Sequence, residues 1–288
     1  MTAHVAERGE GRGRMVLGIE CSEPVSARAL AATVHVAQAF HAEVECLLIE
    51  DRQLFDVANY TFAREVSAAA PTGRGIDIDA LATDMRLAAR GAERNLSAMA
   101  RDADVPVQFR PLRDAPVKAL ADACQAMGPW NAVALSRPLS RRLLARTGRL
   151  FDRVTGMTGV VMASDRGDVA DGPVVAVVED FDRLAGMRRT AERLARVSGR
   201  DVRIAIIAAT RRQLAWLERE VRQSVAGMPG VDVVPLGAAG GGAEVAAEAL
   251  RRINPSFVVA AHGGQLLPAE PTPGTLADVL ASPLLIVR

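Results

Sequence analysis

Residue types that carry specialised chemistry are scarce in this sequence. Aromatic residues make up only 3% of the 288 residues, so the core must be built from aliphatic side chains, as in parallel α/β proteins. The three cysteines, Cys21, Cys46 and Cys124, form no C-x-x-C pair, which excludes a zinc ribbon and a redox dithiol. We interpret them as small core residues and expect a cytoplasmic protein.

Charge and hydrophobicity exclude two further classes of partner. The formal net charge of +1 gives no bulk attraction to nucleic acid or to a membrane surface. No apolar run approaches the roughly 20 residues that span a bilayer, and residues 1–14 lack the apolar segment of a signal peptide. We therefore expect no membrane insertion, and we interpret residues 1–14 as a flexible tail.

An arginine-rich helix is expected over Leu139–Val154, and it is the one feature that suggests nucleic acid. Leucines recur on the same stretch at helical spacing. This combination favours an amphipathic helix with a solvated basic face, so a nucleic-acid partner is not our interpretation.

Short apolar runs alternate with amphipathic helical stretches along the rest of the chain, which is typical of parallel α/β folds. In the first half the expected strands are Met15–Ile19, Val44–Ile49, Val105–Phe109, Ala132–Leu135 and Gly159–Ala163. In the second half they are Val174–Val178, Val202–Ala208, Val231–Leu236, Phe257–Ala261 and Leu284–Val287. This internal repeat predicts an α/β protein of two tandem Rossmann-like domains, each with a doubly wound, mostly parallel five-stranded sheet.

A polar, Gly- and Asp-rich segment, Ser164–Gly172, separates the two sets of strands and is interpreted as a linker. The domains are then residues 15–166 and 172–288. The first domain is longer, chiefly because two additional helical stretches are expected over Arg52–Ala70 and Leu81–Met99.

Two helix assignments depend on shorter signals. Ser22, followed by Glu23 and Pro24, is the expected N-cap of the first helix. A short final helix is expected over Leu276–Leu280.

The most specific motif lies after the apolar run that begins at Phe257. It consists of Ala261, His262, Gly263 and Gly264, then nine residues, then Gly274 and Thr275. Glycines just past a strand allow backbone N–H groups to approach an anion closely. A threonine hydroxyl can add a further hydrogen bond to a phosphate.

This spacing resembles the G-2x-G-9x-G-[ST] loop of the nucleotide-binding universal stress proteins, with Ala261 in the first glycine position. The segment from Val16 to Glu23 is similar to the opening of the same family, in which a strand ends in Asp and is followed by Gly-Ser-Glu. Here Glu20 stands at the Asp position and Cys21 at the Gly position. In the second half, either Glu179 or Asp180 could take the acidic role.

The resemblance implies a nucleotide site in the second half. The acidic residue would lie at the adenine end, and the loop containing Ala261, His262, Gly263, Gly264, Gly274 and Thr275 would hold ribose and phosphates. The ligand would be ATP or another adenine nucleotide, with the involvement of Mg²⁺ left open. In the first half the corresponding spacing falls on Leu135–Pro138 and Gly148-Arg149, where two of the three glycines are missing. We predict that the first half does not bind nucleotide in this manner.

The resemblance therefore predicts a binding or regulatory protein of the stress-response type. Family members commonly pair their last strands, so we expect a homodimer or an intramolecular pseudo-dimer that joins Gly159–Ala163 to Leu284–Val287. Two alternatives stay open. One is a protein-interaction scaffold without nucleotide, in which Arg52–Met99 forms the partner surface. The other is a weak ATPase, although no Ser-His-Asp arrangement or carboxylate pair argues for catalysis.

Overall fold

The computed structural model extends over the 288-residue chain. It describes residues 13–22, 25–67, 70–126, 131–135, 154, 157–163, 171–238, 242–267 and 279–288.

The strands of the first half form one parallel set. They are β1 (Arg14–Glu20), β2 (Glu43–Asp51), β5 (Val107–Asp114), β6 (Asn131–Leu135) and β7 (Met157–Met162). Their order in the sheet is β5-β2-β1-β6-β7, and each neighbouring pair is parallel. The chain first builds the sheet from β1 outward through β2 to β5, and it then crosses back to add β6 and β7 on the other side of β1. This reversal is expected for a doubly wound sheet.

The second half repeats the arrangement. Its strands are β8 (Val174–Val178), β9 (Val202–Ala208), β10 (Val231–Ala238), β11 (Phe257–Ala261) and β12 (Leu284–Val287). They follow the order β10-β9-β8-β11-β12, again all parallel. The two halves therefore share one topology, which confirms the predicted fold class; the predicted domain limits at 166 and 172 stay predictions.

The two sheets join at their last strands. β7 and β12 pair antiparallel, with Gly159 opposite Val287 and Met162 opposite Leu284, so the strands form one ten-stranded sheet. The expected pairing of the last strands is thus confirmed. The approach is close at Gly159, where an added Cβ would lie 2.9 Å from the carbonyl oxygen of Ile286. Only glycine fits there without moving a backbone.

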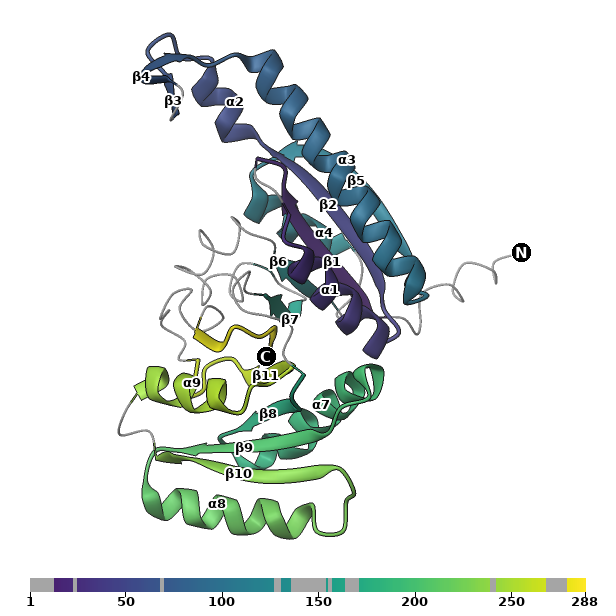
Figure 1. The fold of residues 1–288 in the computed structure, drawn as a ribbon, viewed down its shortest axis with the longest axis vertical. Helices are drawn as coiled ribbons and strands as arrows, with labels where there is room; N and C mark the ends of the chain where they lie inside the picture. The colour runs from purple at the N-terminus through teal and green to yellow at the C-terminus, as the bar shows by residue number, and fades with distance from the viewer. Residues whose placement is uncertain are drawn as a thin grey trace, which may run out of the picture.

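Helices cover both faces of this sheet (Figure 1). One face packs against α1 (Ala27–Ala39), α3 (Ile78–Asp102), α7 (Leu184–Ser198) and α8 (Arg211–Ser224). The other face packs against α4 (Pro116–Ala126) and α9 (Gly242–Arg252). The core is aliphatic, as the low aromatic content predicts, and the three cysteines are buried and free.

One predicted helix is wrong. In place of a helix over Arg52–Ala70, α2 (Arg52–Ala58) ends after two turns, and β3 (Arg64–Ser67) and β4 (Ala70–Gly75) form a separate antiparallel hairpin. Asn59 ends the helix, because its side-chain amide donates to the Phe55 carbonyl at 2.9 Å. The Pro-Thr-Gly-Arg-Gly sequence, expected as a break, lies within β4.

The predicted N-cap of α1 is also wrong. The cap is Ser26, whose hydroxyl accepts from the Ala29 N–H at 3.3 Å. Ser22 instead donates to Oε1 of Glu20 at 3.1 Å, because a turn at residues 21 and 22 keeps it beside the end of β1.

Several expected elements lie largely outside the described residues. Of the helix expected over Leu139–Val154 the structure describes Val154 alone, and of the linker Ser164–Gly172 it describes residues 171 and 172. The short helix expected over Leu276–Leu280 is described only at residues 279 and 280, which are helical.

Candidate functional site

The candidate site lies where β8 and β11 end side by side. The two strands are parallel neighbours, so Glu179 and Asp180 after β8 reach the same edge of the sheet as the turn that follows Ala261. In the order β10-β9-β8-β11-β12, this is the point where the winding of the sheet reverses. Open α/β sheets bind ligands at such switch points, at the carboxyl ends of their strands.

Glu179 binds the glycine turn directly. Its carboxylate accepts hydrogen bonds from the backbone N–H groups of Gln265 and Leu266, the second at 2.9 Å. Gly264 lies against the same carboxylate, and a Cβ at this position would overlap it. A larger residue at position 264 would therefore have to displace the Glu179 carboxylate that holds the turn.

Other amide groups of the turn also have partners. The His262 N–H donates to the Val287 carbonyl at 2.8 Å, and the Gly263 N–H donates to the Leu267 carbonyl at 2.9 Å. Gly263 has a φ of 78°, a conformation that favours glycine. The turn is thus held from within, and an anionic ligand can use the Gln265 and Leu266 amides only if the Glu179 carboxylate moves away.

The carboxylates of Glu179 and Asp180 make different contacts, although which of them takes the acidic role in ligand binding stays a prediction. Glu179 binds the turn, whereas the Asp180 side chain accepts from the Asp182 N–H at 3.0 Å and caps the 3₁₀ helix η1 (Phe181–Arg183). Asp180 is exposed and Glu179 is half-buried. Each carboxylate therefore has a distinct place at this edge.

A cavity of about 380 Å³ opens between these elements. It is lined by Val177, Glu179, Asp180, Arg183, Met187, Ala261, Gly263, Gly264 and Gln265. Among the described residues, its ionisable lining consists of two carboxylates and one guanidinium. Such a cavity offers acceptors to amino or hydroxyl groups and one cation to an anionic group.

The structure brings most of the predicted site residues together. Five of them line the cavity, and His262 lies in the turn but outside this lining. Gly274 and Thr275 lie outside the described residues. Sequence reasoning missed Arg183, Met187 and Gln265; for Arg183 a signal existed, because it lies one helical turn after the acidic pair.

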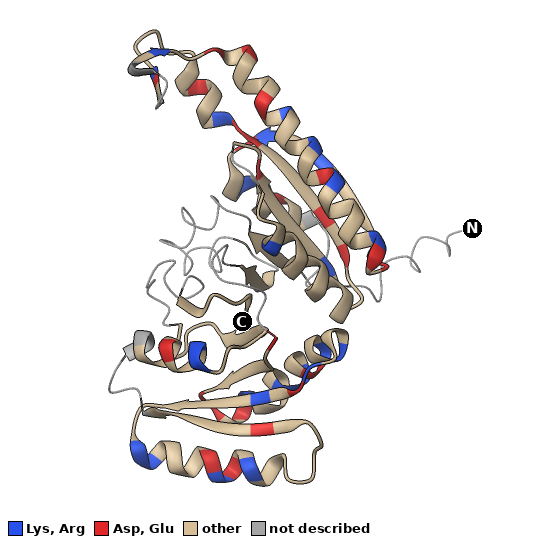
Figure 2. Cartoon of the chain, in the orientation of Figure 1, with Lys and Arg blue, Asp and Glu red and all other residues tan. Residues whose placement is uncertain are grey.

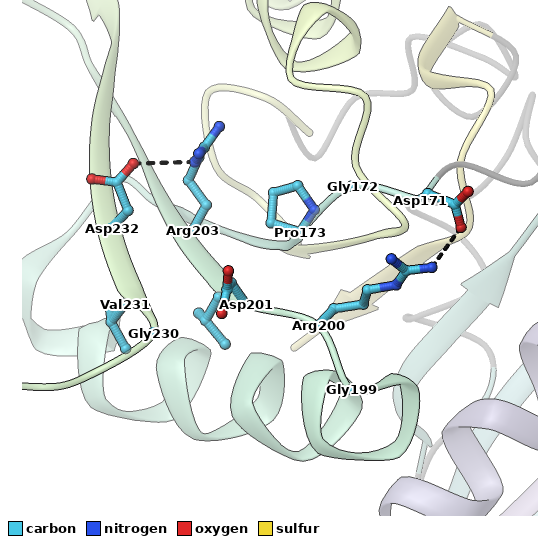
Figure 3. A pocket seen from close by; sticks show the side chains of 11 residues that line it. Asp171, Gly172, Pro173, Gly199, Arg200, Asp201, Arg203, Gly230, Val231 and Asp232 are labelled. Atoms are coloured by element: carbon cyan, nitrogen blue, oxygen red, sulfur yellow. Dashed lines mark hydrogen bonds and ion pairs between the residues drawn. The ribbon is translucent and has the colours of Figure 1, made fainter.

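A larger cavity, of about 520 Å³, lies at the opposite edge of the same half (Figure 3). It is formed at the amino ends of β8, β9 and β10. Its two arginines are engaged by acids: Arg200 pairs with Asp171, and Nε of Arg203 lies 3.3 Å from Oδ2 of Asp232. Ligands of parallel sheets bind at the carboxyl ends of strands, so this cavity is a weaker candidate.

In the first half a cavity of about 420 Å³ lies between the end of β1 and α3. Its lining includes Cys21, Ser22, Leu81 and Met85 and is more apolar than that of the second half. Burial raises the pKa of the Cys21 thiol to about 12, so the thiol is neutral at physiological pH. Glu20 is buried beneath Ser22 and is not part of this lining.

The described residues form neither a metal cluster nor a membrane-spanning helix. They contain no group of three or more His, Cys, Asp or Glu side chains placed to hold a metal ion. No helix within the described part of the chain is both long and apolar enough to cross a membrane.

Comparison with known proteins identifies the fold. No protein-family model and no curated protein sequence matches the chain. Among solved structures, a universal stress protein from Archaeoglobus fulgidus DSM 4304 superimposes with a TM-score of 0.62 at 15% identity, over 96% of this chain and 97% of that one.

Two structures from Pseudomonas aeruginosa agree with this match. A protein of strain UCBPP-PA14, classed provisionally as a universal stress protein, has a TM-score of 0.53 at 13% identity over 96% of this chain and 93% of that one. A protein of unknown function from strain PAO1 has a TM-score of 0.51 at 15% identity over 96% and 92%. The chain therefore has the fold of tandem universal stress proteins, which confirms the resemblance at the level of the fold.

Proposed function

We propose that this chain is a regulatory binding protein whose second half takes up an adenine nucleotide. The observation that carries the proposal is the cavity at the β8–β11 switch point, where two carboxylates, one arginine and a glycine turn meet. We further propose a cytoplasmic, stress-related role, in keeping with the three free cysteines and with the folds of the neighbours described above.

The lining suits the different parts of a nucleotide. Asp180 is exposed at the cavity and can accept hydrogen bonds from an adenine amino group or from ribose hydroxyls. Met187 and Val177 supply apolar surface for a base. Arg183 is the one cation among the described residues of the lining, and its planar guanidinium can bind a phosphate through two parallel hydrogen bonds.

Glu179 limits where the phosphates can lie. Because its carboxylate already holds the Gln265 and Leu266 amides, a phosphate beside those groups would meet a like charge. We therefore assign the phosphates to the Arg183 side of the cavity. We also propose that Gly274 and Thr275 bind phosphate, as the sequence motif predicts.

The first experiment is to denature the purified protein, extract small molecules and identify them by mass spectrometry. A thermal melt with added ATP, ADP and AMP follows. Retained adenine nucleotide, or a rise in melting temperature that increases with ligand concentration, supports the proposal; ligand at 100 times its Kd stabilises a protein by about 2.7 kcal/mol. An empty protein whose melting temperature responds to none of the three contradicts it.

Two matched variants then place the site. Arg183→Gln removes the cation of the proposed site, whereas Arg200→Gln removes one from the cavity at the opposite edge. Loss of a charge-assisted hydrogen bond costs about 1.5 to 3 kcal/mol, so Arg183→Gln should weaken nucleotide binding by about tenfold or more. Arg200→Gln should leave the affinity unchanged. Equal effects of the two changes would show that the site is misplaced.

A further inference from the structure

The cavity of about 420 Å³ in the first half has no part in the proposed nucleotide site. It lies between the end of β1 and one side of α3, the long helix of the first half in Figure 1. Its lining extends along α3 from Leu81 to Asn95, which is about 20 Å of helix. A cavity of this volume and length is large enough for an elongated small molecule.

The second half fills the corresponding space with aromatic rings. α8 is the equivalent of α3, because each follows the second strand of its half and packs on the same face of the sheet. Phe181 stands two residues after Glu179, and the centroid of its ring lies 6.3 Å from that of Trp216 on α8. In the first half Ser22 stands two residues after Glu20. A hydroxyl beside an open cavity thus takes the place of a packed ring.

Small residues keep the middle of the cavity open. Ala88, Gly91 and Ala92 recur on the cavity side of α3 at helical spacing. A Cβ added at Gly91 would meet no atom within 4 Å, so packing does not require a glycine there. Glycine inside a helix is also less favourable than alanine. Space for a ligand is the feature that this residue provides.

The floor of the cavity is apolar and its rim is polar. Cys21, Met85 and Ala92 belong to the lining, and each is no more than 3% exposed. Met85 is flexible and polarisable, so it can adapt to the shape of an apolar ligand. Ser22 and Asp84 belong to the same lining and are exposed. The cavity therefore matches a molecule with an apolar body and one polar end.

The rim offers hydrogen-bond acceptors and a negative charge. Among the described residues of the lining, the Asp84 carboxylate is the one charged group, and a carboxylate only accepts hydrogen bonds. The Ser22 hydroxyl donates its proton to Oε1 of Glu20 at 3.1 Å, so its own oxygen faces other groups as an acceptor. A ligand end that donates hydrogen bonds and carries a positive charge fits this rim.

The surroundings of the cavity favour the same charge. Besides burial, three nearby carboxylates raise the pKa of the Cys21 thiol, those of Glu50, Glu20 and Glu93. α3 carries both signs of charge along its length (Figure 2), but no lysine, arginine or histidine among the described residues lines the cavity. An anionic ligand would find no cation here, in contrast to Arg183 in the second half.

We propose that the first half binds an organic ammonium ion with an elongated apolar body. The body lies along α3 on Met85 and Ala92, and the ammonium group lies at the rim, where it donates to the Asp84 carboxylate and the Ser22 hydroxyl. This site shares no residue with the proposed nucleotide site, so either can fail without the other. The two halves would then take ligands of opposite charge.

Isothermal titration calorimetry of the full chain at pH 7 tests this with three probes that share one alkyl chain: octylamine, 1-octanol and octanoate. An exposed ion pair changes affinity by about twofold to fivefold, and a like-charge contact acts oppositely by a similar factor. We therefore expect octylamine to bind about tenfold more tightly than octanoate, with octanol between them. Equal affinities, a preference for octanoate, or no binding of any probe would overturn the proposal.

A matched pair of leucine substitutions places the site. Gly91→Leu puts a side chain into the cavity, whereas Gly186→Leu makes the same change on α7, where an added Cβ also meets no atom within 4 Å. Both replace a helical glycine with a better helix former, so both variants should fold. Gly91→Leu should weaken octylamine binding by about tenfold or more, and Gly186→Leu should leave it unchanged. Equal effects of the two would overturn the assignment to this cavity.

A second pair tests the position of the charge. Asp84→Asn should reduce the preference for octylamine over octanol by about twofold to fivefold and leave the affinity for octanol unchanged. The control is Asp79→Asn, an exposed acid of the same helix that lies outside the lining. It should keep the wild-type preference. A preference for octylamine that survives Asp84→Asn in full would overturn the placement of the ammonium group at Asp84.

Discussion

The two halves of this chain share one topology and use it differently. In the second half the acid at the end of the first strand, Glu179, reaches across to the turn after β11 and holds two of its amides. In the first half the corresponding acid, Glu20, is buried and is engaged by Ser22 two residues later. The second half therefore keeps both acids of this edge in the lining of a polar cavity, while in the first half Glu20 does not line the cavity beside the end of β1.

The connections after the second strand differ as well. In the second half two residues link β9 to α8, whereas the first half inserts residues 52–77, which form α2, β3 and β4, between β2 and α3. The comparison teaches that one strand order can carry different side-chain contacts at the end of its first strand and different connections after its second. The following predictions test how far the halves depend on each other.

The largest effect is expected at the seam between the halves. Gly159→Val places a branched side chain where even a Cβ would lie 2.9 Å from the Ile286 carbonyl. Because both strands are buried, the side chain cannot turn to solvent, and we expect a loss of about 2 to 3 kcal/mol in the free energy of unfolding. Urea denaturation measures it. The control is Gly91→Ala on α3, where an added Cβ has open space and should raise stability slightly.

The second prediction separates the acid that holds the turn from its neighbour. Glu179→Gln places an amide N–H₂ against a backbone N–H and removes a charge-assisted pair of hydrogen bonds, which should cost about 1.5 kcal/mol. Hydrogen exchange at Gln265 and Leu266 should accelerate. Asp180→Asn, one residue away, should leave exchange at those two amides unchanged, because Asp180 binds Asp182 instead. Equal exchange in both variants would contradict the assignment of the turn contact to Glu179.

Much of the fold could be predicted from the sequence alone. The strands are aliphatic runs bounded by turn residues, so their positions follow from local pattern, and the shared strand order follows from the repeat. The hairpin of β3 and β4 was missed because Ala-rich residues between Ala63 and Ala70 favour a helix locally. The end of α2 depends on one side-chain hydrogen bond from Asn59, which the helical spacing of apolar residues does not reveal.

The candidate site could be predicted only in part, because its main contact joins residues that are far apart in the sequence. The glycine motif and the acidic pair are visible in the sequence, but the contact between Glu179 and Gln265 joins residues 86 positions apart. It depends on the register of β8 beside β11. That register determines which of the two adjacent carboxylates contacts the turn. Neither the spacing nor the composition of the sequence predicts it.

The third prediction uses the cysteines, all of which lie in the first half. Burial raises the pKa of Cys124 to about 11 and that of Cys21 to about 12, and it also raises the pKa of Cys46. Since the thiolate is the reactive form, labelling by an alkylating reagent near pH 8 should be slow in the native protein and rapid after unfolding. Labelling therefore reports the opening of the first half alone.

Glu179→Gln, which alters the second half, then tests whether the halves open together. The sheet is continuous through β7 and β12, so we expect thiol labelling in this variant to be accelerated by about tenfold, as a loss of about 1.4 kcal/mol implies if opening is shared. An unchanged labelling rate beside a lowered overall stability would mean that the halves open independently. Asp180→Asn again serves as the control.

The smallest effect concerns a histidine at the contact between the halves. His35 on α1 is bonded through Nε2 to the Leu194 carbonyl of α7 at 3.0 Å, and its ring lies 5.5 Å from that of Phe257 on β11. Burial lowers the pKa of His35, an effect that the bond to Leu194 partly opposes. The neutral ring is thus favoured in the folded chain, and its contribution is complete above the unfolded value of about 6.5 and is lost as the pH falls below it.

We therefore expect the melting temperature to fall on acidification below about pH 6.5, and His35→Gln to remove part of that fall. The matched control is His41→Asn, at the end of the same helix, where a φ of 51° suits asparagine. It should retain the wild-type pH dependence. If His35→Gln and the wild type lose stability in parallel as the pH falls, protonation of His35 does not weaken the contact between α1 and α7. The pH dependence of stability would then be assigned to the carboxylates.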